Sequence, residues 1–289
     1  MTEPIGFVGL GRMGHAMTGN LTRAGHRVIG FDISPDTARR TAEAHGLDLA
    51  DSVAGVLNAA GIVILMLPNG RIVSETIEAA KTSLREGQLL IDMSSSAPVG
   101  TRELGERLAA AGVGLLDAPV SGGVARAEKG TLAIIVGGEA ALAERARPIL
   151  ETMGSSLIHV GALGAGHAMK ALNNYVSAAG LVAACEAVAV AQEFGIDGDT
   201  AIEVLNNSSG RNNATENKLR QFVLSGSFGS GFSLGLMRKD LATAIELAGL
   251  MQVGTDLTGP VLKLWERAET ELGGQADHTE IAKMVRRPS

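Results

Sequence analysis

Three polar side chains at helical spacing could bind a small polar molecule and exchange a proton with it. They are Lys170, Asn173 and Asn174, in a segment that follows a glycine-rich hinge and opens a long alanine-rich pattern typical of a helix. Residues three and four apart share one face of a helix, so the amine and the two amides would lie together. A solvated lysine near a helix start gives the same pattern, and the rest of the chain has to decide between the two interpretations.

His167 competes with Lys170 for the role of general base. Histidine is the commoner proton carrier near neutral pH, and His167 lies about one helical turn before Lys170. The sequence has no His, Cys, Asp and Glu cluster at metal-ligand spacing, so we predict no metal site. It also lacks the G-x-S-x-G and P-loop motifs. The proton chemistry is therefore expected from the lysine or the imidazole.

The elements that must position these side chains begin with a glycine-rich loop. The apolar run Ile5–Leu10 leads into G-x-G-x-x-G at residues 9–14, and a helical pattern follows. A second strand pattern, Arg27–Asp32, ends in an acid. A strand, this glycine motif, a helix, a strand and an acid in that order are typical of a dinucleotide-binding unit.

Each glycine of the motif has a physical purpose. Gly9 permits a tight turn, Gly11 lets the backbone approach a pyrophosphate, and Gly14 lets the helix pack closely on the strand. The start of the helix then offers free N–H groups and a positive dipole end to phosphates. The residues predicted to bind the cofactor here are Gly9, Leu10, Gly11, Arg12, Met13 and Gly14.

The acid at the end of the second strand predicts which dinucleotide binds. Asp32 follows the glycines by about 20 residues, the spacing at which a carboxylate accepts hydrogen bonds from the ribose hydroxyls. A carboxylate there repels a 2′-phosphate, so we predict NAD and expect NADP less. Arg39 and Arg40 lie further along and leave open that a phosphate could reach one of them.

Strand and helix patterns continue to alternate up to residue 160. The further predicted strands are Ile62–Leu67, Gln88–Met93, Leu115–Leu116, Thr131–Val136 and Leu157–Val160. This alternation predicts a Rossmann-type, doubly wound and mostly parallel sheet with helices on both faces. Ligands of such sheets bind beyond the carboxyl ends of the strands, where Leu67–Pro68, Ser94–Ser96 and Ser121–Gly123 lie.

One of these loops has the groups that an anion needs. Ser121, Gly122 and Gly123 could present a hydroxyl and free backbone N–H groups to a carboxylate. An ordinary glycine turn between strands would have the same sequence. The place of this turn among the other ligand-side loops favours binding.

The strand patterns stop in the second half of the chain. Ala168–Phe194 is one long helical pattern that is apolar on most faces, so we expect it to be buried between two domains or in a dimer core. Further helices are predicted at Asp199–Asn206, Phe232–Leu250 and Leu262–Leu272. The prediction is an α/β domain at residues 1–162 joined by a long helix to an all-α domain at residues 163–289.

Composition excludes several functions. The net charge of −6, without a long basic run, argues against nucleic acid and anionic membranes as partners. The longest nearly uncharged apolar run, Tyr175–Val190, contains Glu186, so no membrane span is expected. Cys185 is the single cysteine and cannot form an intramolecular disulfide, which fits a reducing cytoplasm.

Four separated segments resemble the β-hydroxyacid dehydrogenases, the family of 3-hydroxyisobutyrate dehydrogenase and tartronate semialdehyde reductase. They are GLGRMGHAMTGNL at residues 9–21, DAPVSGG at 117–123, GAGHAMKALNN at 164–174 and KDL at 239–241. The resemblance covers essentially the whole chain. It implies hydride transfer between NAD(H) and a small 3-hydroxy acid or semialdehyde carrying a carboxylate. It also implies a homodimer or homotetramer.

The resemblance also assigns roles. Lys170 would be the catalytic lysine, with Asn174 orienting the substrate, and the residues of the Ser121–Gly123 turn would hold the carboxylate. Leu67, Pro68 and Ser95 would line the nicotinamide side of the site. Lys239 would contact cofactor or substrate, with Asp240 beside it at the substrate.

One departure and three alternatives remain open. Several relatives carry an aromatic residue where this chain has Asn213, which suggests a more polar pocket near Arg211. Imine reductases share the fold but usually replace the lysine that is present here. Non-catalytic scaffold members lose the lysine and gain basic tails, and this chain does neither. An NAD-binding redox sensor is supported only by the first half of the chain.

Overall fold

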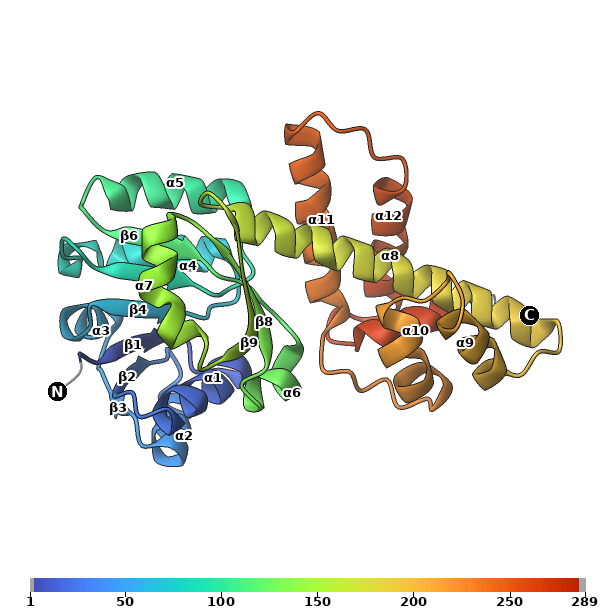
Figure 1. The fold of residues 1–289 in the computed structure, drawn as a ribbon, viewed down its shortest axis with the longest axis horizontal. Helices are drawn as coiled ribbons and strands as arrows, with labels where there is room; N and C mark the ends of the chain where they lie inside the picture. The colour runs from blue at the N-terminus through green and yellow to red at the C-terminus, as the bar shows by residue number, and fades with distance from the viewer. Residues whose placement is uncertain (1–2, 286–289) are drawn as a thin grey trace. The chain divides into compact units, whose positions relative to one another are not determined.

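The computed structural model describes residues 3–285 and divides the chain into two compact units, one ending at Lys170 and one beginning at Ala171. Figure 1 draws both units. The first unit is a sheet with helices, and the second is helical. The predicted domain boundary, between residues 162 and 163, lies just before the long helix α8 (Ala165–Glu193) and stays a prediction.

The first unit is built on one sheet whose strand order is β3-β2-β1-β4-β5-β6-β8-β7, with β9 paired to β8. The strands are β1 Ile5–Val8, β2 Val28–Phe31, β3 Asp48–Leu49, β4 Ile62–Leu65, β5 Leu89–Asp92, β6 Gly114–Asp117, β7 Val120–Ser121, β8 Leu132–Gly137 and β9 Gly154–Gly161. The order 3-2-1-4-5-6 is that of dinucleotide-binding sheets. The predicted Rossmann-type unit is therefore confirmed.

Alternating side chains divide the hydrophobic core between the two faces of the sheet. Phe7, Ile64 and Ile91 pack on one face with residues of α1 (Arg12–Arg23) and α7 (Ala140–Leu150). Val63 and Leu90 pack on the other face with helices α3 Val53–Ala59, α4 Gly70–Ala79 and α5 Pro98–Ala109. Successive residues of a strand point to opposite faces, so these apolar runs need helices on both sides. The helix α2 (Pro35–His45) lies beside α1.

The sheet departs from the parallel arrangement after β6. Strand β8 runs antiparallel to β6 and β7, and β9 runs parallel to β8. The sequence predicted the strands β8 and β9 but not their direction. The periodicity of hydrophobic residues indicates which residues are buried, and it does not indicate whether a strand runs parallel or antiparallel to its neighbour. Sequence reasoning also missed β3, β7, α3 and the six-residue helix α6 (Gly123–Glu128), which are too short to show a period.

The second unit contains only helices among its described residues. They are the main part of α8, then α9 Gly198–Asn206, α10 Asn213–Asn217, a π-helical turn at Leu219–Leu224, α11 Leu234–Leu250, α12 Thr258–Leu272 and a 3₁₀ turn at His278–Met284. Gly195 has φ +95°, the left-handed conformation expected for the residue that ends α8. The core of this unit packs around the fully buried Trp265.

Helix α8 exposes part of its apolar surface in the single chain, and its predicted burial in a dimer core stays a prediction. Val176 and Val190 are 67 % and 69 % exposed, and Phe194 just after the helix is 84 % exposed. By length and composition α8 could also cross a bilayer, contrary to the expectation that the chain has no such segment. Core helices of globular domains pass the same test, so this is weak support for a membrane span.

Three buried ionisable groups of the second unit have shifted pKa values. Burial raises the pKa of the Cys185 thiol to about 12, so the thiol stays protonated at neutral pH. Burial lowers the pKa of Lys218, whose Nζ donates to Ser177 Oγ at 3.0 Å, to about 8. Burial, reinforced by the charge of Lys218, lowers the pKa of His278 to about 4 and keeps its imidazole neutral.

Candidate active site

The loop after β1 has the geometry that a close approach of a ligand requires. Gly9 has φ +97°, and a Cβ there would overlap the carbonyl oxygen of Met66. A Cβ on Gly14 would overlap the carbonyl oxygen of Gly9, so helix α1 lies directly on the loop. Around Gly11 a Cβ would meet no atom within 4 Å. Two of the glycines thus allow tight packing, and the middle one faces open space.

Helix α1 begins without a side-chain cap. Gly11 is its N-cap residue and makes no side-chain hydrogen bond, and the first turn contains no acidic residue. The first N–H groups of a helix have no partner within it, and they attract an anion when no carboxylate occupies them. This donor set fits a pyrophosphate beside Gly11.

Asp32 fixes the same loop from the neighbouring strand. Its Oδ2 accepts a hydrogen bond from the Leu10 N–H at 2.7 Å, and its Oδ1 accepts one from the Ser34 N–H at 2.8 Å. A carboxylate oxygen has two lone pairs, so each oxygen keeps a position for a hydroxyl. Ile33, which follows it, is 92 % exposed. The residues at the ends of β1 and β2 therefore fit a dinucleotide with ribose hydroxyls at Asp32.

Two of the predicted loops at the carboxyl edge are tied to each other. The Leu67 N–H, just after β4, donates to Ser94 Oγ at 2.9 Å, just after β5. Leu67 and Ser95 are half-buried, and Pro68 is exposed. The structure thus brings the Leu67–Pro68 and Ser94–Ser96 segments together at one place on the edge.

The Ser121–Gly123 segment joins an edge strand to a short helix. Ser121 ends the edge strand β7, and Gly123 begins helix α6. Gly122 has φ +128° and Gly123 has φ +65°, values that L-residues with a side chain rarely adopt. Both glycines are exposed, and no side chain caps α6. The segment therefore keeps exposed glycine backbone beside a hydroxyl, as an anion site requires.

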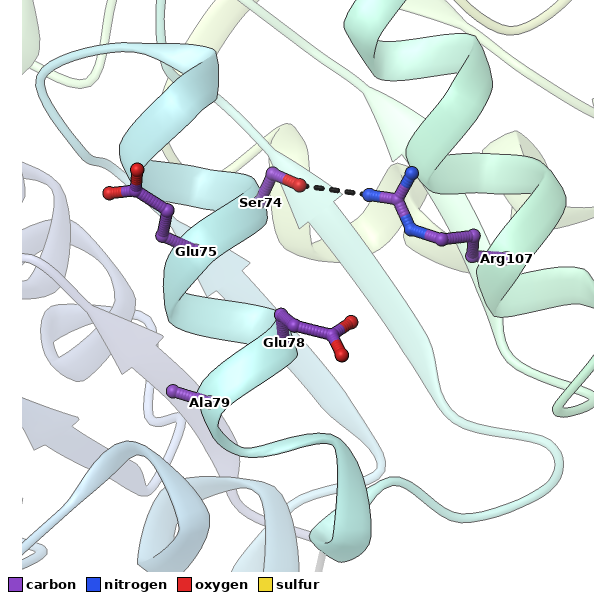
Figure 2. A pocket seen from close by; sticks show the side chains of 5 residues that line it. All are labelled: Ser74, Glu75, Glu78, Ala79 and Arg107. Carbon is purple, nitrogen blue, oxygen red and sulfur yellow. Dashed lines mark hydrogen bonds between the residues drawn. The ribbon is translucent and has the colours of Figure 1, made fainter.

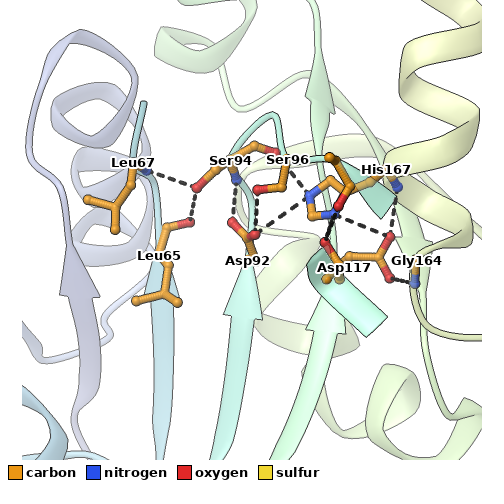
Figure 3. Close-up of polar contacts among 10 residues, drawn as sticks. Leu65, Leu67, Asp92, Ser94, Ser96, Asp117, Gly164 and His167 are labelled. Atoms are coloured by element: carbon orange, nitrogen blue, oxygen red, sulfur yellow. Dashed lines mark hydrogen bonds and ion pairs between the residues drawn. The ribbon is translucent and has the colours of Figure 1, made fainter. Parts of the chain in front are cut away.

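A buried polar network lies where β5, β6 and α8 meet (Figure 3). Asp117 Oδ1 accepts from the Gly164 N–H at 2.8 Å, and its Oδ2 accepts from the His167 N–H at 2.7 Å. The His167 ring contacts Thr101 Oγ1 at 2.8 Å and the carbonyl oxygen of Ser94 at 3.1 Å. The side chain of His167 is fully buried. Because both ring nitrogens have protein partners, His167 is not a candidate for the base.

Helix α8, the predicted catalytic helix, carries further polar residues one to two turns after His167. Lys170 is half-buried at the end of the first unit. In the second unit, Asn174 Nδ2 donates to Asp240 Oδ2 at 2.6 Å, and both residues are buried. Asn173 Nδ2 donates to Asn174 Oδ1 at 3.2 Å, and Lys239 Nζ lies 3.6 Å from Asp240 Oδ1. The structure thus joins the predicted residues of α8 and α11 within that unit.

A surface hollow between α4 and α5 contains none of the predicted site residues. Arg107 Nη2 donates to Ser74 Oγ at 2.8 Å there, and Glu75, Glu78 and Ala79 complete the lining (Figure 2). The side chains come from two exposed helix faces. We assign no chemistry to this hollow.

The polar loop before α10 is occupied by local contacts. Arg211 pairs with Glu216, with Nε 2.6 Å from Oε1, and Asn212 caps α10 by accepting from Ala214 and Thr215 N–H groups. A Cβ on Gly180 of α8 would lie 3.7 Å from the Asn212 amide. The loop therefore packs beside the middle of α8, more than a turn beyond Asn174.

Sequence reasoning missed the supporting acids of the site. Asp92 and Asp117 each end a buried strand and are 2 % and 0 % exposed. Asp92 accepts from the Ser94 N–H and from Ser96 Oγ. A charged residue at the carboxyl end of an apolar strand pattern was the available signal. No group of three His, Cys, Asp or Glu side chains between residues 3 and 285 could hold a metal ion, and the absence of a metal stays a prediction.

Comparisons with known proteins agree with this geometry. Residues 4–161 match the NAD binding domain of 6-phosphogluconate dehydrogenase, and residues 164–285 match the NAD-binding domain of NADP-dependent 3-hydroxyisobutyrate dehydrogenase. The chain is 38 % identical to the 3-hydroxyisobutyrate dehydrogenase of Pseudomonas aeruginosa over 99 % of each chain. It is 33 % identical to the 2-(hydroxymethyl)glutarate dehydrogenase of Eubacterium barkeri, over 97 % of this chain and 94 % of the relative.

A solved structure gives the same answer. The chain resembles the Mycobacterium tuberculosis 3-hydroxyisobutyrate dehydrogenase in complex with L-serine with a TM-score of 0.92 and 33 % identity, over 99 % of this chain and all of that one. The sheet order, the glycine loop and the helical second unit agree with the matches across the chain. The protein belongs to the 3-hydroxyisobutyrate dehydrogenase family of NAD(P)-dependent β-hydroxyacid dehydrogenases.

Proposed function

We propose that the protein transfers a hydride between NAD(H) and a small 3-hydroxy acid, one that carries a hydroxymethyl group on the carbon next to its carboxylate. The observation that carries this proposal is the placement of Lys170 one turn after a buried network at the carboxyl edge of a dinucleotide-type sheet. The compounds in the relatives' names, 3-hydroxyisobutyrate and 2-(hydroxymethyl)glutarate, both contain such a hydroxymethyl carboxylate. L-serine, bound in the solved relative, contains it too.

The chain's own residues would bind and orient this acid. The substrate carboxylate accepts hydrogen bonds from the Ser121 hydroxyl and the N–H groups of Gly122 and Gly123. Asn174 orients the alcohol, because its amide donates a hydrogen bond to Asp240 that fixes the side chain. Lys239, which neighbours Asp240, contacts cofactor or substrate.

Lys170 would move the proton. It contacts the alcohol oxygen and accepts its proton during oxidation, and it returns a proton to the forming alkoxide during reduction. The dinucleotide, when bound, supplies the hydride acceptor or donor. The glycine loop and Arg12 and Met13 would hold its pyrophosphate, and Leu67, Pro68 and Ser95 would lie on its nicotinamide side.

The cofactor is proposed to be NAD in preference to NADP. The Asp32 carboxylate is fixed by the Leu10 and Ser34 N–H groups, so it stays where a 2′-phosphate would be repelled. We expect Asp32→Ser to lower the ratio of NAD to NADP kcat/KM by about tenfold, the equivalent of ~1.4 kcal/mol. Steady-state kinetics with both cofactors measure this ratio. An unchanged ratio would contradict the role of Asp32.

A cytoplasmic homodimer or homotetramer completes the proposal. The exposed apolar residues of α8, Val176 and Val190, support association with a second copy. The free, buried thiol of Cys185 supports a reducing compartment.

The decisive experiment is a panel of hydroxymethyl carboxylic acids and the matching semialdehydes, each with NAD(H) and NADP(H), read as the absorbance of reduced nicotinamide. Lys170→Ala should lower kcat by about 10²–10⁴-fold and leave NAD affinity nearly unchanged, because a positioned acid–base group contributes that much. Parallel loss of NAD binding would show that Lys170 serves the cofactor instead. No turnover of any compound by the wild type would refute the proposed reaction and favour a sensor or imine reductase.

A further inference from the structure

The first turn of α8 rests directly on the ends of two strands. A Cβ on Gly166 would lie 2.5 Å from the carbonyl oxygen of Ile135 and 2.8 Å from that of Asp117. A Cβ on Gly137 would lie 2.7 Å from the Gly166 N. Real Cβ atoms do not come this close to backbone atoms, so only glycine permits the contact. The start of α8 therefore has little freedom to move toward the sheet.

Asp117 fixes the same turn through the backbone. Its two oxygens accept the N–H groups of Gly164 and His167, and the carboxylate is fully buried. Hydrogen bonds to an ionised acceptor are the stronger ones. This contact sets the height of α8 above β6 but does not connect it to the loop after β5.

The His167 side chain makes that connection. Its Nε2 lies 3.1 Å from the carbonyl oxygen of Ser94, which can only accept, so Nε2 carries the proton. Its Nδ1 lies 2.8 Å from the Thr101 hydroxyl of α5, which also donates to the carbonyl oxygen of Ala97. Ser94 in turn donates its N–H to Asp92 Oδ1 at 2.9 Å, and its Oγ accepts the Leu67 N–H. One rigid ring thus bridges α8, α5 and the Leu67 and Ser94 loops.

We propose that His167 is a positioning residue that sets the place of Lys170 relative to the Ser94–Ser96 loop. This inference rests on the proposed function, in which Lys170 handles the proton and Ser95 lies on the nicotinamide side. Lys170 is three residues beyond His167, so a shift or rotation of the first turn is passed directly to the amine. A displacement of about 1 Å of a reacting group can cost 10²-fold in rate.

The test compares three variants of buried histidines. His167→Phe keeps a planar ring and removes both hydrogen bonds. His167→Gln keeps an N–H donor and an oxygen acceptor and serves as the conservative replacement. His278→Phe is the matched control, since His278 is also a buried histidine with hydrogen bonds, to Ser230 and to the carbonyl oxygen of Phe232. It lies in the second unit, outside the proposed machinery.

The readout is the single-turnover rate of hydride transfer, measured as formation of reduced nicotinamide on enzyme already saturated with NAD. This rate constant is normalised to bound cofactor, so loss of folded protein does not change it. We expect His167→Phe to lower it about 10- to 100-fold with NAD affinity unchanged. His167→Gln should recover most of the rate, and His278→Phe should keep the wild-type rate while lowering thermal stability.

Three outcomes separate this inference from the proposed function. A wild-type rate in His167→Phe, with Lys170→Ala inactive, would overturn the positioning role and leave the proposed function intact. Equal slowing by His278→Phe would also overturn it, because any buried histidine would then have the same effect. If the wild type turns over no substrate, the proposed function fails. Hydrogen exchange then tests the His167 contact by itself. His167→Phe must speed amide exchange in residues 164–170 and in residues 94–96 together.

Discussion

Helices α1 and α8 both begin at the carboxyl edge of the same sheet, yet their first turns are treated in opposite ways. At α1, no side chain caps the helix, no acid lies in the first turn, and the space around Gly11 is open. At α8, the buried carboxylate of Asp117 takes the N–H groups of Gly164 and His167. One helix start is left for an anion from outside, and the other is closed by an anion that belongs to the chain.

The difference shows how one edge of a sheet can bind a ligand at one helix and hold another helix in place. Unsatisfied N–H groups of a helix attract negative charge wherever it comes from. Where the fold supplies a carboxylate, these N–H groups stabilise the protein. Where it supplies none, the same N–H groups can bind a negatively charged ligand. The two helix starts should therefore respond oppositely to mutation.

Removing the built-in anion should have the largest effect on stability. Asp117→Ala leaves two buried N–H groups without an acceptor, and each such group costs 1–3 kcal/mol, so we expect a loss of about 4 kcal/mol. Urea unfolding measures the loss. Asp197→Ala removes the exposed carboxylate that caps α9 and should lower the free energy of unfolding much less. Equal losses in the two variants would mean that burial adds nothing to the Asp117 contact.

Two glycines of the α1 start should separate folding from binding. Gly14→Ala places a Cβ on the Gly9 carbonyl oxygen and should destabilise the protein by about 3 kcal/mol. Gly11→Ala meets nothing within 4 Å in the protein, so stability should change by less than about 0.5 kcal/mol. NAD(P) affinity should nevertheless fall, because the methyl group occupies the approach to the backbone.

Titration of NAD(P) by fluorescence, beside urea unfolding, tests this pair. Gly100→Ala is the control, since a Cβ there also meets no atom within 4 Å and helix α5 holds none of the residues assigned to the cofactor. Wild-type affinity in Gly11→Ala would place the pyrophosphate elsewhere.

Asp117 places a carboxylate at the start of α8, and giving the start of α1 a carboxylate as well should produce the smallest change in stability. Arg12→Glu puts a carboxylate in the exposed first turn and should stabilise the fold by about 0.5 kcal/mol. The same charge should weaken NAD(P) binding about 10- to 100-fold, since it replaces attraction by repulsion near the phosphates. Thermal unfolding and cofactor titration must therefore move in opposite directions. A change of both in the same direction would break the comparison.

Much of the fold was predictable because strong local patterns agree with the global arrangement. Strands β1, β2, β4 and β5 were predicted within about two residues, since fully buried parallel strands give continuous apolar runs between turns. The reversal at β8 was not predictable, because strand direction depends on a chain path that hydrophobicity does not record. The two-residue strand β7 depends on its partner β8 and has no pattern of its own.

The candidate site divides in the same way. The glycine loop was predictable because its conformation demands particular residues, as the positive φ of Gly9 illustrates. The role of His167 was not predictable, because a general base and a buried residue that links helices and loops by hydrogen bonds can both be a histidine. Only its burial and the partners of its two ring nitrogens distinguish them. The roles of Lys170, Asn174 and Lys239 stay predictions, and Lys170→Ala tests the first of them.

The state of Cys185 has a practical consequence. This thiol is the chain's single cysteine, it is buried, and its pKa is raised to about 12. Alkylating reagents react with thiolates, so the unaltered protein should react very little with them. Cysteines introduced on exposed positions of each unit would then be the only reactive ones. Spectroscopic labels on such a pair could follow the distance between the two units during turnover without any background mutation.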